Sequence, residues 1–264
     1  MRERPPGRWP LIALLAGAAA LAACDEEEEV AEDTPIVEVS RIGDIVWPPL
    51  AVREAGMAIS EDPLAENNMV VLDMSGSMGE GGCSGDHRNR AEAAKEALFR
   101  WIAANPGDNI GLVSFASDGI ALAVPLGRGE AHAERLVAEI EALIPGGGTP
   151  LASAMALGVE ALERHAARQN GTGTYRLIVI TDGEASSGES PRALVAEVAG
   201  NPANAIELHT IGFCIEGGHA LNDPHAVFYA DANSPEDLAS GLEAVAGEAA
   251  AFDAGDISFE ELTP

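Results

Sequence analysis

Short apolar runs alternate with amphipathic stretches along the chain from Asn68 onward. Six of these runs have the length and apolar character of strands in a sheet. They cover residues 69–72, 110–115, 121–126, 177–180, 206–213 and 227–230. The third run follows the second after a tight Asp118-Gly119 turn, which predicts a hairpin and therefore an antiparallel edge strand.

Helix signals lie between the predicted strands. An apolar stripe from Ala91 to Ile102 predicts a helix that ends at the turn 105–107. Three further helices are expected where a hydroxyl residue precedes proline, an arrangement typical of an N-cap: Thr149-Pro150, Ser190-Pro191 and Ser234-Pro235. The alternation predicts a doubly wound α/β domain, with a mostly parallel six-stranded sheet, one antiparallel edge strand and helices on both faces.

The residues that follow the predicted strands carry oxygen-rich side chains. In a doubly wound sheet, ligands bind beyond the carboxyl ends of the strands, where the strand order reverses. Asp73, Ser75 and Ser77 follow the first strand, and Asp182 follows the strand at 177–180. Glycines at 146–148 let the backbone turn sharply before Thr149. Such ligands suit a hard cation better than zinc or copper.

This set resembles the metal-ion-dependent adhesion site of von Willebrand factor type A domains, a family that includes the integrin inserted domains. The Asp-x-Ser-x-Ser loop, the threonine after glycines and the strand-end Asp-Gly occur in the same order and context, over about residues 68–250. The resemblance implies a divalent cation, with Mg²⁺ as the first choice and Ca²⁺ or Mn²⁺ as alternatives. The implied metal ligands are Asp73, Ser75, Ser77, Thr149 and Asp182, the two carboxylates acting largely through bound water.

Charge decides which partners are expected. Two carboxylates only neutralise a divalent ion, so the ion stays electrophilic toward an outside group, and the resemblance implies an Asp or Glu carboxylate of a protein partner. The formal net charge is −28 and the pI is about 4.3, which excludes nucleic acid as the expected partner. Basic residues are expected around the partner's carboxylate, because an acidic domain repels an acidic partner.

Each predicted ligand also has an ordinary structural interpretation. Ser75 and Ser77 are suited to capping the segment that follows them, Thr149 is suited to capping its helix, and Asp182 before Gly183 is suited to a turn. Order and context together favour the metal site.

A non-enzymatic binding module is therefore the leading hypothesis, and no catalytic residue is assigned. The enzymatic alternative is a metal-dependent hydrolase such as a phosphatase of the haloacid dehalogenase type. Those enzymes need a second aspartate where this chain has Ser75, and a late lysine, whereas Lys95 is the only lysine here. A third hypothesis is a structural scaffold in envelope assembly, in which the metal loop only stabilises the fold.

The N-terminus predicts export and a lipid anchor. A basic start precedes the apolar run 11–23, which is too short to span a bilayer. The run ends in Leu-Ala-Ala-Cys24, which resembles a lipobox with an acylated cysteine; an ordinary signal peptide is the alternative. We expect a lipoprotein signal peptide (1–23), an acidic, proline-containing tether and lead-in strand (24–67), the domain (68–251) and a tail (252–264). The protein would be lipid-anchored in the bacterial cell envelope, with its domain on the extracytoplasmic side.

Export changes the expectation for the other two cysteines. Cys83 and Cys214 form an even pair in an oxidising compartment, which predicts a disulfide; two buried free thiols are the alternative. No CxxC or paired Cys/His spacing supports a zinc site. Both cysteines are expected on the metal-bearing face, so we hypothesise that a disulfide braces the rim of the site.

Overall fold

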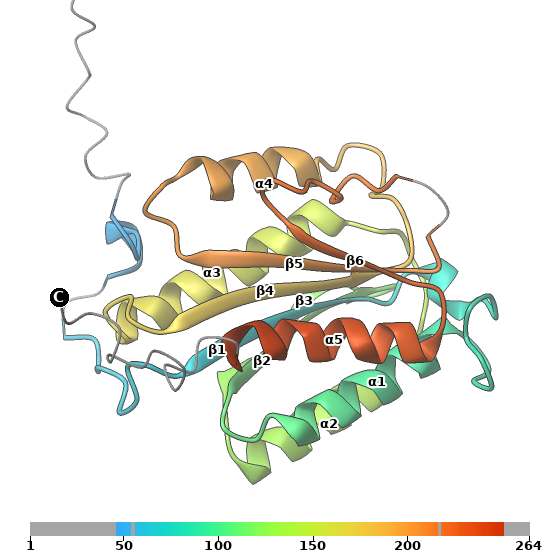
Figure 1. Ribbon diagram of the computed structural model, residues 1–264, viewed down its shortest axis with the longest axis horizontal. Coiled ribbons are helices and arrows are strands. Elements are labelled where there is room, and N and C mark those ends of the chain that lie inside the picture. Colours follow the sequence, from blue (N-terminus) through green and yellow to red (C-terminus); the bar gives the residue numbers. More distant parts are fainter. Residues whose placement is uncertain (1–45, 54–55, 216–217, 251–264) are drawn as a thin grey trace, which may run out of the picture. The chain divides into compact units, whose positions relative to one another are not determined.

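Six strands form one sheet in the order β3-β2-β1-β4-β5-β6 in the computed structural model, which describes residues 46–53, 56–215 and 218–250 (Figure 1). The strands are β1 (Glu66–Asp73), β2 (Asn109–Ala116), β3 (Gly119–Gly127), β4 (Thr174–Thr181), β5 (Ile206–Phe213) and β6 (Phe228–Ala232). Only β3 runs antiparallel to its neighbour, at one edge of the sheet. The predicted fold class is confirmed.

Helices cover both faces of this sheet. They are α1 (Arg90–Ala104), α2 (Glu130–Ala142), α3 (Leu151–Arg168), α4 (Pro191–Gly200) and α5 (Pro235–Ala250), with short 3-10 turns η2 (Leu50–Val52) and η3 (Gly76–Gly79). Figure 1 shows α3 and α4 on one face and α1, α2 and α5 on the other. Among the described residues, no helix is long and apolar enough to cross a membrane.

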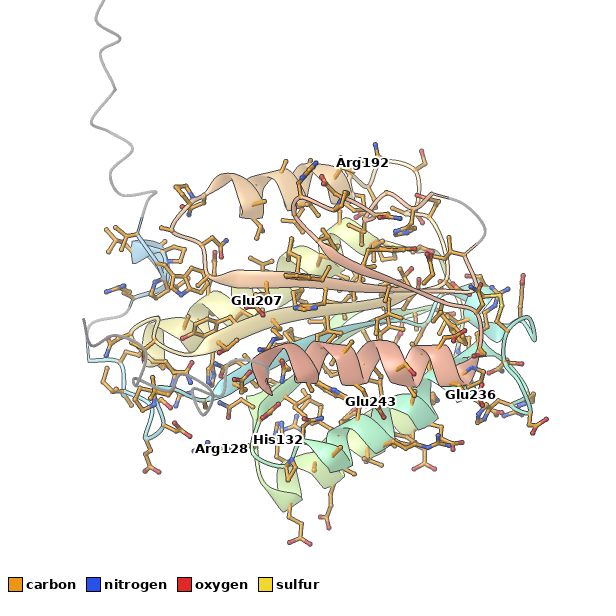
Figure 2. The ribbon with its side chains drawn as sticks, viewed as in Figure 1. Arg128, His132, Arg192, Glu207, Glu236 and Glu243 are labelled. Atoms are coloured by element: carbon orange, nitrogen blue, oxygen red, sulfur yellow. A yellow bond between two sulfur atoms is a disulfide. The ribbon has the colours of Figure 1, made fainter. Side chains whose placement is uncertain are left out.

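Alternate residues of the central strands pack into two separate hydrophobic cores, one on each face of the sheet. Val70 and Leu72 of β1 pack with α1 and α5, whereas Met69 and Val71 pack with α3 and α4. Because both faces are covered, the strand is an almost continuous apolar run. The outer helices are amphipathic instead: Figure 2 shows Glu236 and Glu243 on α5, where both side chains are exposed.

The described residues before β1 pack against the domain. Within the described residues 46–53 and 56–65, its regular structure is limited to η2. The ring of Trp47 lies edge-on to Tyr175 with centroids 5.4 Å apart, and the amide of Ser60 donates to the carbonyl of Arg168 at 2.7 Å. Prolines such as Pro48 and Pro63 have no amide hydrogen for a strand ladder. The rest of the segment in which the lead-in strand was expected, residues 24–45, lies outside the described residues, so that strand stays a prediction.

His165 on α3 is expected to make the stability of this fold depend on pH. Burial, followed by the charge of Arg168, lowers the pKa of His165 from 6.5 to about 4. The unfolded chain therefore takes up this proton near pH 6.5, but the folded chain only near pH 4. The folded state therefore keeps its full stability with respect to His165 above pH 6.5. It loses stability as the pH falls from 6.5 toward about 4, because the unfolded chain binds this proton first.

Urea unfolding at several pH values tests this expectation. Between pH 7 and pH 4.5 the wild type should lose about 1–2 kcal/mol more than His165→Gln, after allowance for the partial exposure of the ring. The exposed His225 supplies the control, and His225→Gln should follow the wild type. Parallel pH profiles for the wild type and His165→Gln would contradict the assignment.

Candidate functional site

The strand order places two chain segments side by side at one edge of the sheet. β1 lies between β2 and β4, so the direction in which strands are added reverses beside β1. Ligands bind to sheets of this kind at the carboxyl ends of the strands that flank such a switch point. The Asp73–Ser77 loop follows β1 and Asp182 follows β4, so both lie at this position.

Ser77 connects the two segments directly. Its hydroxyl oxygen lies 3.0 Å from that of Ser75, and it donates a hydrogen bond of 2.6 Å to Oδ1 of Asp182. Asp73 accepts from the amide of Ser75 at 2.8 Å. These bonds bring together Asp73, Ser75, Ser77 and Asp182, which are four of the five residues predicted to bind a metal.

Thr149 is held at the same edge by its neighbours. The carbonyl of Gly147 accepts from the amide of Gly76 at 3.1 Å, which ties the glycine loop to the Asp73–Ser77 loop. On the other side, the amide of Thr149 donates to Oγ of Ser186 at 2.8 Å, and its carbonyl accepts from the amide of Ser186 at 2.9 Å. The fifth predicted ligand is therefore fixed through its backbone.

The glycines before Thr149 are required by close approaches. Gly147 has φ of +82°, and a Cβ atom there would lie 2.9 Å from the carbonyl oxygen of Ala116. A Cβ atom on Gly148 would lie 2.9 Å from Oγ of Ser186. A side chain at Gly147 would push the loop away from the end of β2, whereas at Gly148 it would displace the Ser186 hydroxyl that accepts from Thr149.

The prediction that Thr149 caps its helix is wrong. Helix α3 begins at Leu151, its N-cap is Pro150, and no side chain makes a capping hydrogen bond. By contrast, Oγ of Ser234 accepts from the amide of Asp237 at 3.1 Å and caps α5 as expected. The Thr149 hydroxyl is thus not committed to the cap.

Asp73 is a buried carboxylate whose environment disfavours its charge. Its side chain is fully buried, and this burial raises the pKa of the carboxyl group. Hydrogen bonds from Ser75 and Thr181 lower the pKa in part, and the nearby charge of Asp182 raises it further. Among the described residues, no cation contributes to this balance. A bound cation would therefore stabilise the ionised form.

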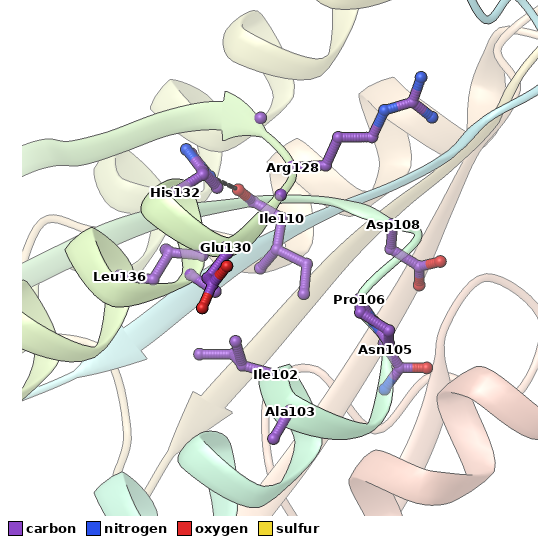
Figure 3. A pocket seen from close by; sticks show the side chains of 13 residues that line it. Ile102, Ala103, Asn105, Pro106, Asp108, Ile110, Arg128, Glu130, His132 and Leu136 are labelled. Carbon is purple, nitrogen blue, oxygen red and sulfur yellow. Dashed lines mark hydrogen bonds between the residues drawn. The ribbon is translucent and has the colours of Figure 1, made fainter.

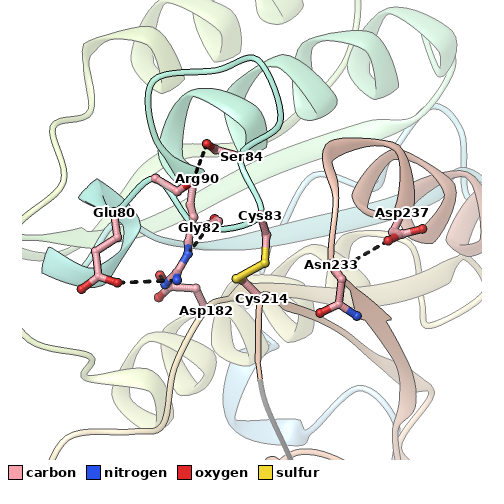
Figure 4. Close-up of a disulfide and its surroundings, with 10 residues drawn as sticks. Glu80, Gly82, Cys83, Ser84, Arg90, Asp182, Cys214, Asn233 and Asp237 are labelled. Atoms are coloured by element: carbon pink, nitrogen blue, oxygen red, sulfur yellow. Dashed lines mark hydrogen bonds and ion pairs between the residues drawn. A yellow bond between two sulfur atoms is a disulfide. The ribbon is translucent and has the colours of Figure 1, made fainter.

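Arg90, the first residue of α1, forms an ion pair with Asp182 that the sequence analysis did not predict. Its Nη1 atom lies 2.9 Å from Oδ2 of Asp182, and its Nε donates to the carbonyl of Gly82 at 3.1 Å. Figure 4 shows the guanidinium between Asp182, Gly82 and Glu80. Its position becomes visible only in three dimensions, because 92 residues separate Arg90 from Asp182.

The predicted disulfide between Cys83 and Cys214 is confirmed. It joins the loop after η3 to the end of β5 across a sequence separation of 131 residues, with the two Cα atoms 5.7 Å apart. Gly82, whose carbonyl binds Arg90, is the neighbour of Cys83 (Figure 4). The disulfide therefore lies one residue from a contact that leads to the candidate site.

Two further residues support the strand-end loop. Oγ1 of Thr181 donates to Oδ2 of Asp73 at 2.7 Å, a role that its place beside Asp182 could have suggested. His219 is buried, and its Nε2 donates to the carbonyl of Gly183 at 3.0 Å while its Nδ1 accepts from the amide of Leu221. No spacing pattern in the sequence marks His219 for this contact.

A cavity of about 240 Å³ lies away from this site, at the opposite end of the sheet. Figure 3 shows it between the end of α1, the start of β2 and α2, with His132 turned toward the carbonyl of Ile110 at 2.8 Å. None of the predicted ligands lines it. Among the described residues, no group of three or more His, Cys, Asp or Glu side chains could hold a metal.

Comparison with known proteins agrees with this architecture. Residues 68–184 match the von Willebrand factor type A domain family. Over these residues the chain is similar to that family, which agrees with the resemblance, and the solved structures below share its fold. A protein from Borreliella burgdorferi described only as uncharacterized is 30% identical over 144 residues, which are 54% of this chain and 39% of that protein. The chain thus matches less than half of that relative's length.

Solved structures share the fold at low sequence identity. A von Willebrand factor type A protein from Catenulispora acidiphila has a TM-score of 0.56 and 18% identity, over 69% of this chain and 42% of that chain. The open conformation of the pilus adhesin SpaC from Lactobacillus rhamnosus GG has a TM-score of 0.54 and 17% identity, over 73% and 31%. Proximal thread matrix protein 1 from the mussel byssus, with a zinc-occupied metal-ion-dependent adhesion site, has a TM-score of 0.53 and 20% identity, over 69% and 47%.

Proposed function

We propose that this chain is a lipid-anchored cell-envelope protein whose domain binds a protein partner through a divalent cation, without enzymatic activity. The cation would be held by Asp73, Ser75, Ser77, Thr149 and Asp182. The observation that carries the proposal is the oxygen cluster at the switch point, where the Ser77 hydroxyl contacts both Ser75 and Asp182. The metal-occupied site of the mussel protein and the adhesin role of SpaC support it.

The spacing of the hydroxyls suits a small hard cation. Two oxygens that bind Mg²⁺ at right angles, each at about 2.1 Å, lie about 3 Å from one another. The Ser75 and Ser77 hydroxyl oxygens are 3.0 Å apart. Because all five side chains offer only oxygen, Mg²⁺ or Mn²⁺ is favoured over zinc.

The hydrogen bonds of the serines favour ligation over nucleophilic catalysis. A serine nucleophile needs a general base within hydrogen-bond reach. The hydroxyls of Ser75 and Ser77 contact one another, and Ser77 donates to a carboxylate that is already paired with Arg90. The proposed activity of the site is therefore coordination of the cation by a partner's carboxylate, which involves no covalent step.

The envelope location rests on two independent features. Cys24, the proposed lipid attachment residue, lies outside the described residues, together with the signal peptide and acidic tether that frame it in the sequence. Within the domain, the Cys83–Cys214 disulfide is typical of proteins that fold in oxidising compartments. Both features fit an exported protein.

Titration calorimetry of Mn²⁺ and Mg²⁺ into the purified protein tests the site. We expect saturable binding that weakens about tenfold or more in Ser77→Ala, because one oxygen ligand is lost. Ser153→Ala is the matched control, since the Ser153 hydroxyl on α3 contacts Glu189 instead of the site. Equal Mn²⁺ affinity in Ser77→Ala and the wild type would refute ligation by this hydroxyl.

Partner binding is tested with the same variants. The proposal predicts an envelope protein that binds the immobilised wild type in Mg²⁺ and is released by EDTA. The same protein should not bind the immobilised Ser77→Ala variant. Partner binding that is unchanged both by EDTA and by the Ser77→Ala substitution would exclude a metal-mediated contact.

A further inference from the structure

We propose that Arg90 makes metal binding at this site depend on the partner's carboxylate. By pairing with Asp182, Arg90 would leave a bound divalent ion with uncompensated positive charge, which an external carboxylate then neutralises. The inference rests on the proposed metal site and assigns a positioning and specificity role to a residue outside the predicted ligand set.

The ion pair is shielded from solvent. The Asp182 side chain is 0% exposed and the Arg90 side chain is 12% exposed, so water screens their interaction little. Arg90 holds Oδ2 of Asp182, while Ser77 contacts Oδ1 of the same carboxylate. Asp182 can therefore offer Oδ1, and not both oxygens, toward the Ser75 and Ser77 hydroxyls.

The charge balance follows from this pair. Asp73 and Asp182 together carry two negative charges when ionised, and Arg90 returns one positive charge to the same buried cluster. A divalent ion is then left with one positive charge that the protein does not offset. The Coulomb energy of one charge a few ångström away is substantial when the effective dielectric constant is near 20. Arg90 thus lowers the affinity of the site for the cation alone and raises the affinity of the metal-loaded site for an anion.

Glu80 does not cancel this effect. Its carboxylate lies 3.5 Å from Nη2 of Arg90, but the Glu80 side chain is 68% exposed. An ion pair with so exposed a carboxylate is weak because solvent screens it. The charge of Arg90 therefore acts mainly on the buried Asp182.

Arg90 occupies an electrostatically unfavourable position in its helix, so specific contacts must hold it there. Arg90 is the first residue of α1, where the helix dipole favours negative side chains. The position is maintained by three contacts: Asp182, the carbonyl of Gly82 and Glu80. Gly82 is adjacent to the disulfide-bonded Cys83, so a covalent link holds the loop that orients the guanidinium.

The test compares Mn²⁺ affinity by calorimetry in sodium chloride and in sodium acetate of equal ionic strength, with acetate as the carboxylate probe. Arg90→Gln should bind Mn²⁺ about tenfold more tightly than the wild type in chloride. Acetate should strengthen Mn²⁺ binding by the wild type more than by Arg90→Gln. Arg88→Gln is the matched control: it removes the same charge from an exposed arginine that pairs with Glu92, and it should behave as the wild type.

Arg90→Lys separates charge from shape and keeps the proposal testable if Arg90→Gln does not fold. With the charge retained, its Mn²⁺ affinity and acetate response should stay close to those of the wild type. Unchanged or weaker Mn²⁺ binding by folded Arg90→Gln, or loss of the acetate response in Arg90→Lys, would overturn the role of Arg90 while leaving the metal site intact. Absence of Mn²⁺ binding by the wild type would instead refute the proposed function itself, and this inference with it.

Discussion

Removal of the Cys83–Cys214 disulfide is expected to lower the free energy of unfolding by about 4 kcal/mol, because a cross-link over a long loop restricts the unfolded chain strongly. The sequence separation of the two cysteines is 131 residues, so the bond restrains most of the domain. In the folded state it connects the loop after η3 to the end of β5. Both cysteines have positive φ values, 58° and 59°, a backbone conformation that the cross-link helps to maintain.

Urea unfolding of the double variant Cys83→Ala/Cys214→Ala measures this contribution. Its transition midpoint should fall well below that of the wild type, and reduction of the wild type with a phosphine should reproduce the shift. Cys24→Ser is the matched control, because it removes the remaining cysteine and leaves the disulfide in place. A loss smaller than about 1 kcal/mol would show that the unfolded chain is already restricted without the bond.

The fold could be predicted because the central strands are covered on both faces and so form apolar runs. The prediction for β1 was nevertheless too short, since it started at Met69 while the strand starts at Glu66. The missing residues include Asn67, whose buried amide donates to Ala65, Gln169 and Thr174. Hydrophobic periodicity cannot detect a polar strand start when two of its three hydrogen-bond partners, Gln169 and Thr174, lie more than a hundred positions away.

Helix α2 was not predicted for a related reason. It begins after Gly129, which supplies no capping side chain. Only Leu136 and Ile140 of this helix are buried, so its apolar face is narrow. Both the start signal and the periodicity that identified α1 are therefore weak here.

The candidate site was only partly readable from the chain. Asp73, Ser75 and Ser77 lie on one short loop, so their proximity follows from spacing alone. Asp182 could be added because the ends of parallel strands meet at one edge of the sheet. Arg90 and His219 could not be added, because each acts through a contact with a distant segment and neither belongs to a recognisable spacing pattern.

Asp73→Asn is expected to change stability and metal binding in opposite directions. Without metal, the ionised Asp73 is buried beside Asp182 with no cation among the groups that set its pKa, so the neutral amide should raise the free energy of unfolding by about 1 kcal/mol. The hydrogen bonds can be kept: the amide oxygen accepts from Ser75, and the amide nitrogen donates to Oγ1 of Thr181, which turns toward the carbonyl of Gly183. With metal, the loss of a charge should weaken Mn²⁺ binding about 100-fold.

Thermal unfolding with and without Mn²⁺ reports both effects in one experiment. The wild type should melt at a lower temperature than Asp73→Asn in EDTA. It should gain stability with Mn²⁺, whereas Asp73→Asn should gain much less at the same Mn²⁺ concentration because its affinity is about 100-fold lower. Asp108→Asn is the matched control: burial also raises the pKa of Asp108, but this residue contacts Asn68 at the opposite end of β1 and should leave the Mn²⁺ response intact. If Asp73→Asn instead destabilised the metal-free protein, Asp73 would be a structural carboxylate whose hydrogen bonds outweigh its burial. The opposite result would mean that the fold tolerates an unfavourable buried charge at the position where a cation is proposed to bind.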